Sequence, residues 1–172
     1  MTKIVGSIMI IGATSLLGWK MASDVDRTYE EMQYLRRIMC LLQSEISYSR
    51  AFLAEAFFHI SRNAKSPYNV WLRQLYCCME SHNEGDFETI WNRTISQYLV
   101  GVHLPEKEIA HLRELGQYLG TADIEIQVRH IELFEEQIGI AMKEMREELR
   151  TKKRLYHSLG VMSGIFLAIM LI

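Results

Sequence analysis

The chain of 172 residues is poor in proline and has no cysteine pattern that suits a disulfide framework. It has only two prolines, and a proline inside a helix removes a hydrogen bond and clashes with the preceding turn, so this scarcity favours long helices. Three cysteines, two of them adjacent, are typical of thiols in a reducing compartment. We expect Cys40, Cys77 and Cys78 to be small apolar side chains of the interior.

Catalytic and cofactor motifs are also missing. The sequence has no Gly-rich phosphate loop, no C-x-x-C and no H-E-x-x-H, and no histidine is followed at zinc-binding spacing by another histidine or cysteine. Cys77 and Cys78 with His82 come nearest to a metal site and leave a metal-dependent enzyme as a minor alternative. Paired acids such as Glu135 and Glu136 are typical of solvated helix faces. With a net charge of −2, the sequence predicts a non-enzymatic interaction protein that uses no cofactor and binds no nucleic acid.

No charged residue follows Arg154, and the tail of 18 residues over 155–172 is predominantly apolar. As a helix this tail would extend roughly 27 Å, close to the hydrocarbon thickness of a bilayer. A basic collar precedes it, where cations would meet cytoplasmic headgroups. The collar consists of Arg150, Lys152, Lys153 and Arg154. We predict a C-terminal transmembrane helix over residues 155–172, with a buried core helix as the alternative.

The N-terminal end is apolar as well. Residues 4–19 are 16 uncharged residues, and Trp19 and Lys20 suit a membrane interface. We predict an N-terminal transmembrane helix over residues 1–22. The alternative is a cleaved signal peptide, which would leave a soluble or secreted all-helical domain, although no clean small-x-small site follows Gly18.

Basic residues gather on the inner flank of both predicted spans. The positive-inside bias therefore places residues 23–154 in the cytoplasm and both termini across the membrane. Gly160 and Gly164 form a G-x-x-x-G, a spacing that lets two membrane helices pack closely.

Helical periodicity dominates residues 23–154, and we predict an all-α cytoplasmic bundle of about six helices. Apolar residues of the first helix recur at steps of three and four: Met32, Leu35, Met39, Leu42 and Ile46. Asp86 is expected to cap the fourth helix, Gly120 to close the fifth and Thr121 to cap a long final helix. The final helix has a near-heptad seam: Ile124, Val128, Ile131, Phe134, Ile138, Ala141, Met145 and Leu149. We expect the seam to pack on the first helix, with a coiled coil between chains as the alternative.

The C-terminal half resembles the stage III sporulation protein AB family of endospore-forming bacteria. The resemblance rests on "LRELGQYLG", which fits L-x-x-L-G-x-x-L-G, on Gln127 and Ala141 in the following helix, and on "YHSLGVMSG" before the apolar end. In the N-terminal half, "LRRIMCLLQSEISYS" resembles the family's L-x-x-L-x-E-I-x-Y/F helix. "LAEAF" resembles its L-x-E-A segment, and Trp91 matches a tryptophan of its fourth helix. A proline that the family often has before L-x-E-A is missing here, so the second helix is expected to start differently.

The resemblance implies an assembly protein of a channel complex between mother cell and forespore. The family is similar to the cytoplasmic domain of the inner-membrane platform protein F of type II secretion, which implies a platform coupling a cytosolic ATPase to membrane partners. The implied location is the mother-cell membrane around the forespore. The implied partners are other proteins of the complex and membrane lipids, and self-association is a further expectation. Candidate contact residues are Glu55, Trp91 and Gln127.

Overall fold

The structure is a computed structural model that describes most of the chain. Described are residues 25–49, 52–81, 85–121 and 123–171, with the backbone alone beyond Glu148. The chain forms two compact units, Met1–Ile138 and Gly139–Ile172. The first unit holds the helical domain, and the second holds the later part of the last helix.

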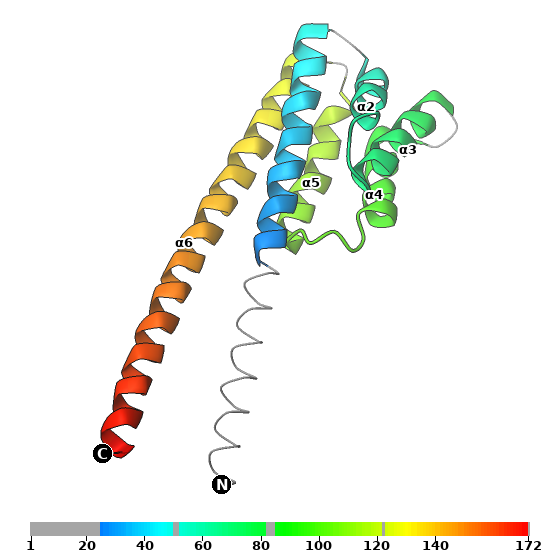
Figure 1. Cartoon of the computed structure of the whole chain (residues 1–172). Coiled ribbons are helices and arrows are strands. Elements are labelled where there is room, and N and C mark those ends of the chain that lie inside the picture. Colours follow the sequence, from blue (N-terminus) through cyan, green and yellow to red (C-terminus); the bar gives the residue numbers. More distant parts are fainter. Residues whose placement is uncertain (1–24, 50–51, 82–84, 122, 172) are drawn as a thin grey trace. The chain divides into compact units, whose positions relative to one another are not determined.

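Six α-helices and one π-helical turn account for nearly all the described residues, and no strand occurs among them (Figure 1). The first helix covers residues 25–44 and passes into the π-helical turn η1 (Glu45–Ser49). After it come α2 (Leu53–Ser61), α3 (Tyr68–Ser81), α4 (Phe87–Tyr98), α5 (Glu106–Leu119) and α6 (Ile124–Leu171). The predicted all-α class is confirmed.

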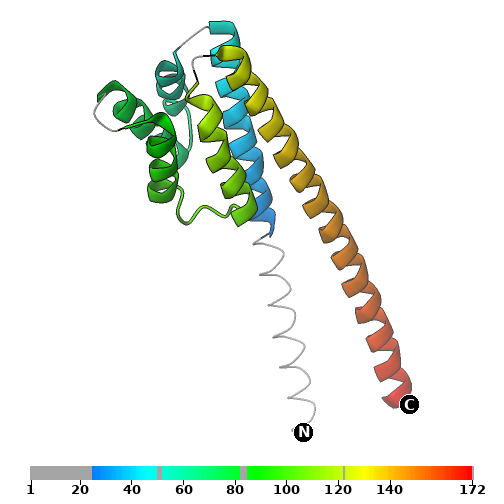
Figure 2. The same ribbon diagram turned by 180° about the vertical axis from the view of Figure 1, so that it is seen from behind.

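The first helix buries the stripe that its periodicity predicts. All five apolar positions are at most 1% exposed: Met32, Leu35, Met39, Leu42 and Ile46. α5 lies beside this helix in both ribbon views (Figures 1 and 2). Two hydrogen bonds join the first helix to the start of α6, from Cys40 Sγ to Glu135 Oε2 and from Gln43 Nε2 to Glu132 Oε1, each 2.9 Å. Glu135 is thus half-buried and bonded, so the prediction of a solvated acidic pair is wrong at this residue.

An aromatic cluster joins α2, α3 and α4. The Trp91 ring lies 5.0 Å from Trp71, 5.7 Å from Phe87 and 6.0 Å from Phe57, centroid to centroid. Trp71, Trp91 and Phe57 are fully buried. Offset and tilted aromatic pairs at these distances stabilise a core beyond the area they bury.

The predicted cap of α4 is confirmed, whereas that of α6 lies two residues later than expected. Asp86 accepts from the Thr89 amide at 3.3 Å and the Thr89 hydroxyl at 2.6 Å. These hydrogen bonds, the hydroxyl first, lower the pKa of Asp86. At α6 the cap is Asp123, whose Oδ1 accepts from the amide of Glu125 at 2.9 Å. Thr121 instead donates to the carbonyl of Tyr118, at the end of α5.

The seam predicted for the final helix holds only in its middle. Ile131, Phe134 and Ile138 are buried as expected, but Ile124 is 46% exposed. The inward position near the start of α6 belongs to Gln127, which is 8% exposed. The apolar periodicity predicted an apolar residue at this inward position. A pattern of apolar residues cannot indicate a polar side chain that is buried by hydrogen bonds to another helix.

Among the described residues, no helix combines the length and apolar character needed to cross a membrane. The predicted span over residues 1–22 lies outside the described residues. For the span over 155–172, the backbone is helical as far as Leu171 and the side chains are not described. Both spans stay predictions.

Candidate interaction surface

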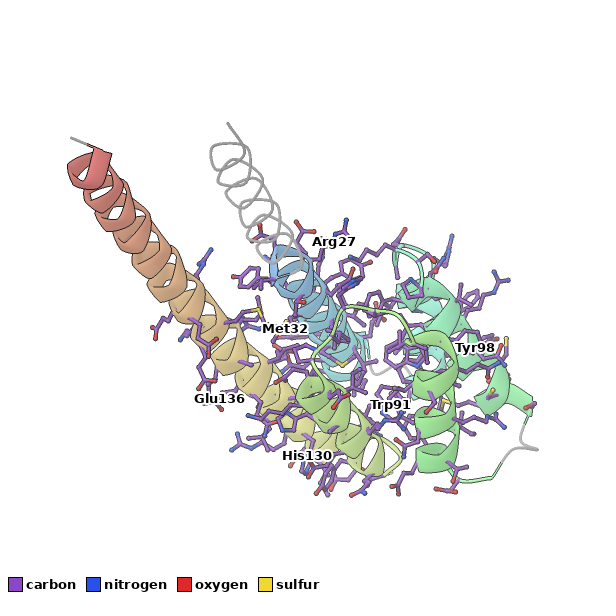
Figure 3. The ribbon with its side chains drawn as sticks, turned by 90° about the horizontal axis from the view of Figure 1, so that it is seen from below. Arg27, Met32, Trp91, Tyr98, His130 and Glu136 are labelled. Carbon is purple, nitrogen blue, oxygen red and sulfur yellow. The ribbon has the colours of Figure 1, made fainter. Side chains whose placement is uncertain are left out.

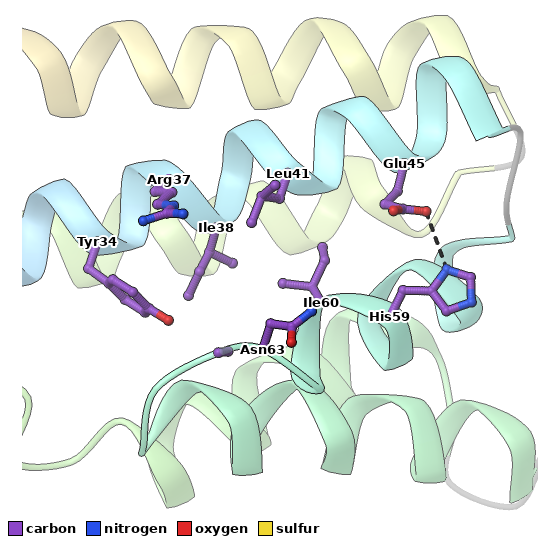
Figure 4. A pocket seen from close by; sticks show the side chains of 9 residues that line it. Tyr34, Arg37, Ile38, Leu41, Glu45, His59, Ile60 and Asn63 are labelled. Atoms are coloured by element: carbon purple, nitrogen blue, oxygen red, sulfur yellow. Dashed lines mark hydrogen bonds and ion pairs between the residues drawn. The ribbon is translucent and has the colours of Figure 1, made fainter.

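A cleft of about 220 Å³ opens between the first helix and α2 (Figure 4). Its apolar part is formed by Ile38 and Ile60, which are 1% and 7% exposed, and by Leu41, which is 45% exposed. Arg37, Glu45, His59 and Asn63 add polar groups to the lining. The cleft is therefore a small hollow of mixed polar and apolar character.

One end of the cleft carries an acid and a histidine. Glu45 Oε2 lies 3.3 Å from Nδ1 of His59, joining η1 to α2 (Figure 4). The His59 side chain is 52% exposed, so solvent screens the pair and its contribution to stability is small. Glu45 stands in a π-helical turn, an irregularity that is frequent at functional sites.

A polar network holds the other end of the cleft. The backbone amide of Lys65 donates to the Tyr34 hydroxyl at 2.6 Å, and the Lys65 ammonium lies 4.5 Å from the centre of the Tyr34 ring. Glu31 accepts from Lys65 Nζ at 3.0 Å and from the Tyr68 hydroxyl at 2.9 Å. Burial first, and then the charge of Glu31, raise the pKa of Tyr68, which remains a neutral donor. The network fixes the α2–α3 loop against the first helix and so defines the shape of the cleft.

Arg37 and Leu41 give the cleft its exposed cation and its exposed apolar side chain. They stand four residues apart on the first helix, so their side chains are neighbours along one face. Within the described part of the chain, Arg37 forms no ion pair or hydrogen bond. The sequence analysis did not predict either residue as part of a binding surface. The helix that lies opposite them is determined by the tertiary structure alone.

Glu55, one of the predicted contact residues, is exposed in the first turn of α2. It stands four residues before His59, so the two side chains lie on one face of α2. An acid in the first turn also interacts favourably with the helix dipole. A partner contact at Glu55 remains open to test.

Trp91, the second predicted contact residue, belongs to the interior. It is fully buried, and its Nε1 donates to the carbonyl of Leu112 on α5 at 2.7 Å. Figure 3 shows it among the side chains between α4 and α5. A Cβ on Gly116 would overlap its ring. We therefore correct the predicted role, because a fully enclosed indole has no surface to offer a partner.

Gln127, the third, is also an interior residue. Its amide nitrogen donates to the carbonyl of Leu119 at 3.0 Å and to that of Thr121. These carbonyls end α5 and begin the turn to α6, and carbonyls at helix ends need such partners. The predicted partner contact is corrected here too, because this side chain closes the α5–α6 turn.

The predicted membrane-associated residues lie mostly beyond what the structure describes. Lys20 lies outside the described residues, and of the collar only the backbone, part of α6, is described. Gly160 and Gly164 stand four residues apart in α6, as a close-packing motif requires.

The cysteines differ from the expectation. Cys78 is buried, but Cys40 and Cys77 are exposed, and His82 lies outside the described residues. Within the described ranges, no group of three or more His, Cys, Asp or Glu side chains is placed to hold a metal ion.

Comparison with known proteins gives one consistent match. The family model of stage III sporulation protein AB matches residues 3–172. Stage III sporulation protein AB of Bacillus subtilis (strain 168) is 23% identical over 171 residues, which cover 99% of each chain. A solved structure of a stage III sporulation protein AB has a TM-score of 0.65 at 18% identity, covering 73% of this chain and 98% of that one. At this identity, the structural likeness shows that the two proteins share the helical fold.

Proposed function

The chain belongs to the stage III sporulation protein AB family, and from this premise we propose that it is a non-enzymatic, membrane-anchored assembly component of a secretion-like complex in sporulating cells. The observation that carries the proposal is the family match over residues 3–172, which includes both apolar ends as well as the helical domain. A role in sporulation follows from the family. The secretion-like complex and the anchoring are our proposal.

The proposed anchors are residues 1–22 and 155–172, with the helical domain on the cytoplasmic side of the mother-cell membrane around the forespore. The support is the charge pattern, in which the collar residues Arg150 to Arg154 stand inward of an uncharged tail. In this arrangement the domain would couple a cytosolic secretion-type ATPase to membrane partners, and the ATPase would be a separate chain. The cleft and Glu55 are the described surface features that such a partner could contact.

Anchoring is tested by thiol accessibility in intact cells. Single cysteines are placed at Asp86 and after Ile172 in a background in which the three native cysteines are replaced. A membrane-impermeant thiol reagent should label the C-terminal probe alone. Labelling of the probe at Asp86 would place the domain outside and exclude a cytosolic motor as a direct partner.

The role in sporulation is tested by deletion. The deletion strain should stop after engulfment and recover when the full chain is supplied. Normal spore yield in the deletion strain would contradict the assembly role.

Glu55→Lys and the matched Glu114→Lys, which changes an exposed acid of α5, then separate the loss of a contact surface from a general effect of changed charge. Only Glu55→Lys should reduce spore yield if α2 binds a partner.

A further inference from the structure

A second exposed surface of the first unit complements the cleft. We call it the α6 stripe, formed by Ile126, Arg129, Leu133 and Glu136. Ile126 and Leu133 are 41% and 37% exposed and stand seven residues apart, two turns along the same helix. The stripe therefore offers apolar surface beside charged groups.

The four residues of the stripe share one face of α6. Their spacing of three, four and three residues follows the helical repeat. The opposite face, with Gln127, Ile131 and Phe134, is buried against the rest of the unit. Figure 3 shows Glu136 on the outer side of α6. The stripe is thus an unpartnered helix face within the described first unit.

The stripe is predominantly acidic, whereas the cleft carries the cation Arg37 together with the Glu45–His59 pair at one end. Three acids, Glu125, Glu132 and Glu136, lie along or beside the stripe, and its one cation, Arg129, lies 3.8 Å from Glu132. Glu136 has no ion pair or hydrogen bond to any described residue, and the same is true of Arg37 at the cleft. Within the described ranges, Glu136 and Arg37 thus each lack a partner of opposite charge, and each stands beside an exposed leucine on its own helix. Complementary charge of this kind fixes the register and orientation of a contact.

We propose that the α6 stripe of one copy docks into the cleft of a second copy of this chain. Leu133 inserts against Leu41 and Ile60, and the carboxylate of Glu136 pairs with the guanidinium of Arg37. The two surfaces differ, so the contact is heterologous and joins copies head to tail, as in a ring or an open row. The contact requires no other protein, so a test of it does not depend on the proposed ATPase.

Cross-linking of the full chain in membranes tests the contact. Two differently tagged copies are co-expressed with Cys40→Ser, Cys77→Ser and Cys78→Ala in both. One copy carries Leu41→Cys and the other Leu133→Cys, and a short bis-maleimide links neighbouring thiols. The control pairs Leu41→Cys with Gln97→Cys, an exposed position on α4. The 41–133 pair should give a heterodimer, and the 41–97 pair should give at most a small fraction of that yield.

Charge reversal makes the test specific. Arg37→Glu in the first copy, or Glu136→Arg in the second, should lower the 41–133 yield by roughly fivefold. Both changes together should restore most of it, because the pair is rebuilt with reversed sign. Both sites are exposed, so folding is retained, and unchanged circular dichroism of each variant verifies this.

Two results would overturn the proposal. One is equal yield from the 41–133 and 41–97 pairs, which would mean that the cleft takes a different protein or no occupant. The other is failure of the double reversal to restore a yield that each single reversal had lowered. Neither result bears on the thiol-accessibility or deletion experiments, so failure of this contact is distinguishable from failure of the proposed function.

Discussion

The indole of Trp91 lies so close to Gly116 that no side chain fits on residue 116. A Cβ added there would overlap Cδ1 of the ring, and the indole nitrogen meanwhile donates to the carbonyl of Leu112, one turn earlier on α5. A glycine inside a helix costs about 0.5–1 kcal/mol relative to alanine. α5 therefore carries an intrinsically unfavourable residue at the point where the Trp91 ring of α4 packs against it.

Gly116→Ala should destabilise the fold although alanine is the better helix former. Overpacking against Trp91 is expected to lower the free energy of unfolding by about 1–3 kcal/mol. Urea unfolding of the full chain in detergent, followed by circular dichroism, measures the change. Glu114→Ala, an exposed change on the same helix, is the control and should stay close to the unchanged chain. A more stable Gly116→Ala would mean that helix propensity outweighs packing at this site.

Thr94 links the two buried tryptophans through one hydroxyl. It accepts from Trp71 Nε1 at 3.2 Å and donates to the carbonyl of Trp91 at 3.0 Å. Thr94→Val keeps the shape but leaves the indole N–H of Trp71 unpaired in the core, which should cost about 1–3 kcal/mol. Thr94→Ser keeps the hydroxyl and should cost less. Unfolding curves that rank the serine variant below the valine variant would contradict this role.

The sequence was most informative where buried residues are apolar and regularly spaced. The stripe of the first helix is an example, since Met32 to Ile46 are buried at every predicted step. The N-cap of α4 at Asp86 was equally predictable, because a helix cap depends on residues close in sequence. Both cases need only local information.

Predictions failed where a side chain bonds to a distant element. Gln127 looked like a contact residue, yet it is buried by its bonds to the end of α5. Trp91 likewise serves the interior, because α5 has a glycine where the ring packs. The cleft combines residues from 34–45 and 59–64, and nothing in either segment indicates that they face each other. Such arrangements follow from packing between helices and are not encoded in a local pattern.

Gln127→Leu and Gln127→Glu test whether this residue closes the α5–α6 turn. Leucine removes the amide donor, leaves the carbonyls of Leu119 and Thr121 unpaired and should cost about 1–3 kcal/mol. Glutamate directs a carboxylate at the same carbonyls and should cost more at neutral pH than at pH 4, where it is protonated in part. A partner-contact role predicts the opposite result, with stability unchanged and only complex formation reduced. Thermal unfolding of the two variants decides between these roles.

The Cys40 thiol should lose its proton only at an unusually high pH, because it lies beside the carboxylate of Glu135. Partial burial of the thiol first, and then the hydrogen bond and negative charge of Glu135, raise the pKa of Cys40 to about 11. The pH dependence of iodoacetamide alkylation, followed by mass spectrometry in a Cys77→Ser, Cys78→Ala background, should show a midpoint near that value. Glu135→Gln removes the charge but keeps an acceptor, so the midpoint should fall part of the way toward the ordinary value of about 8.5.

The same raised pKa links Cys40 to stability at alkaline pH. The folded state favours the neutral thiol, so its contribution is fully present below the unfolded pKa of about 8.5 and is lost as the pH rises through about 11. Cys40→Ser keeps a donor for Glu135 but does not titrate in this range. The difference in unfolding free energy between the two chains should therefore shrink or reverse between these pH values. A constant difference, or an alkylation midpoint near 8.5 in the unchanged Cys40, would show that the thiol does not bond to Glu135 in solution.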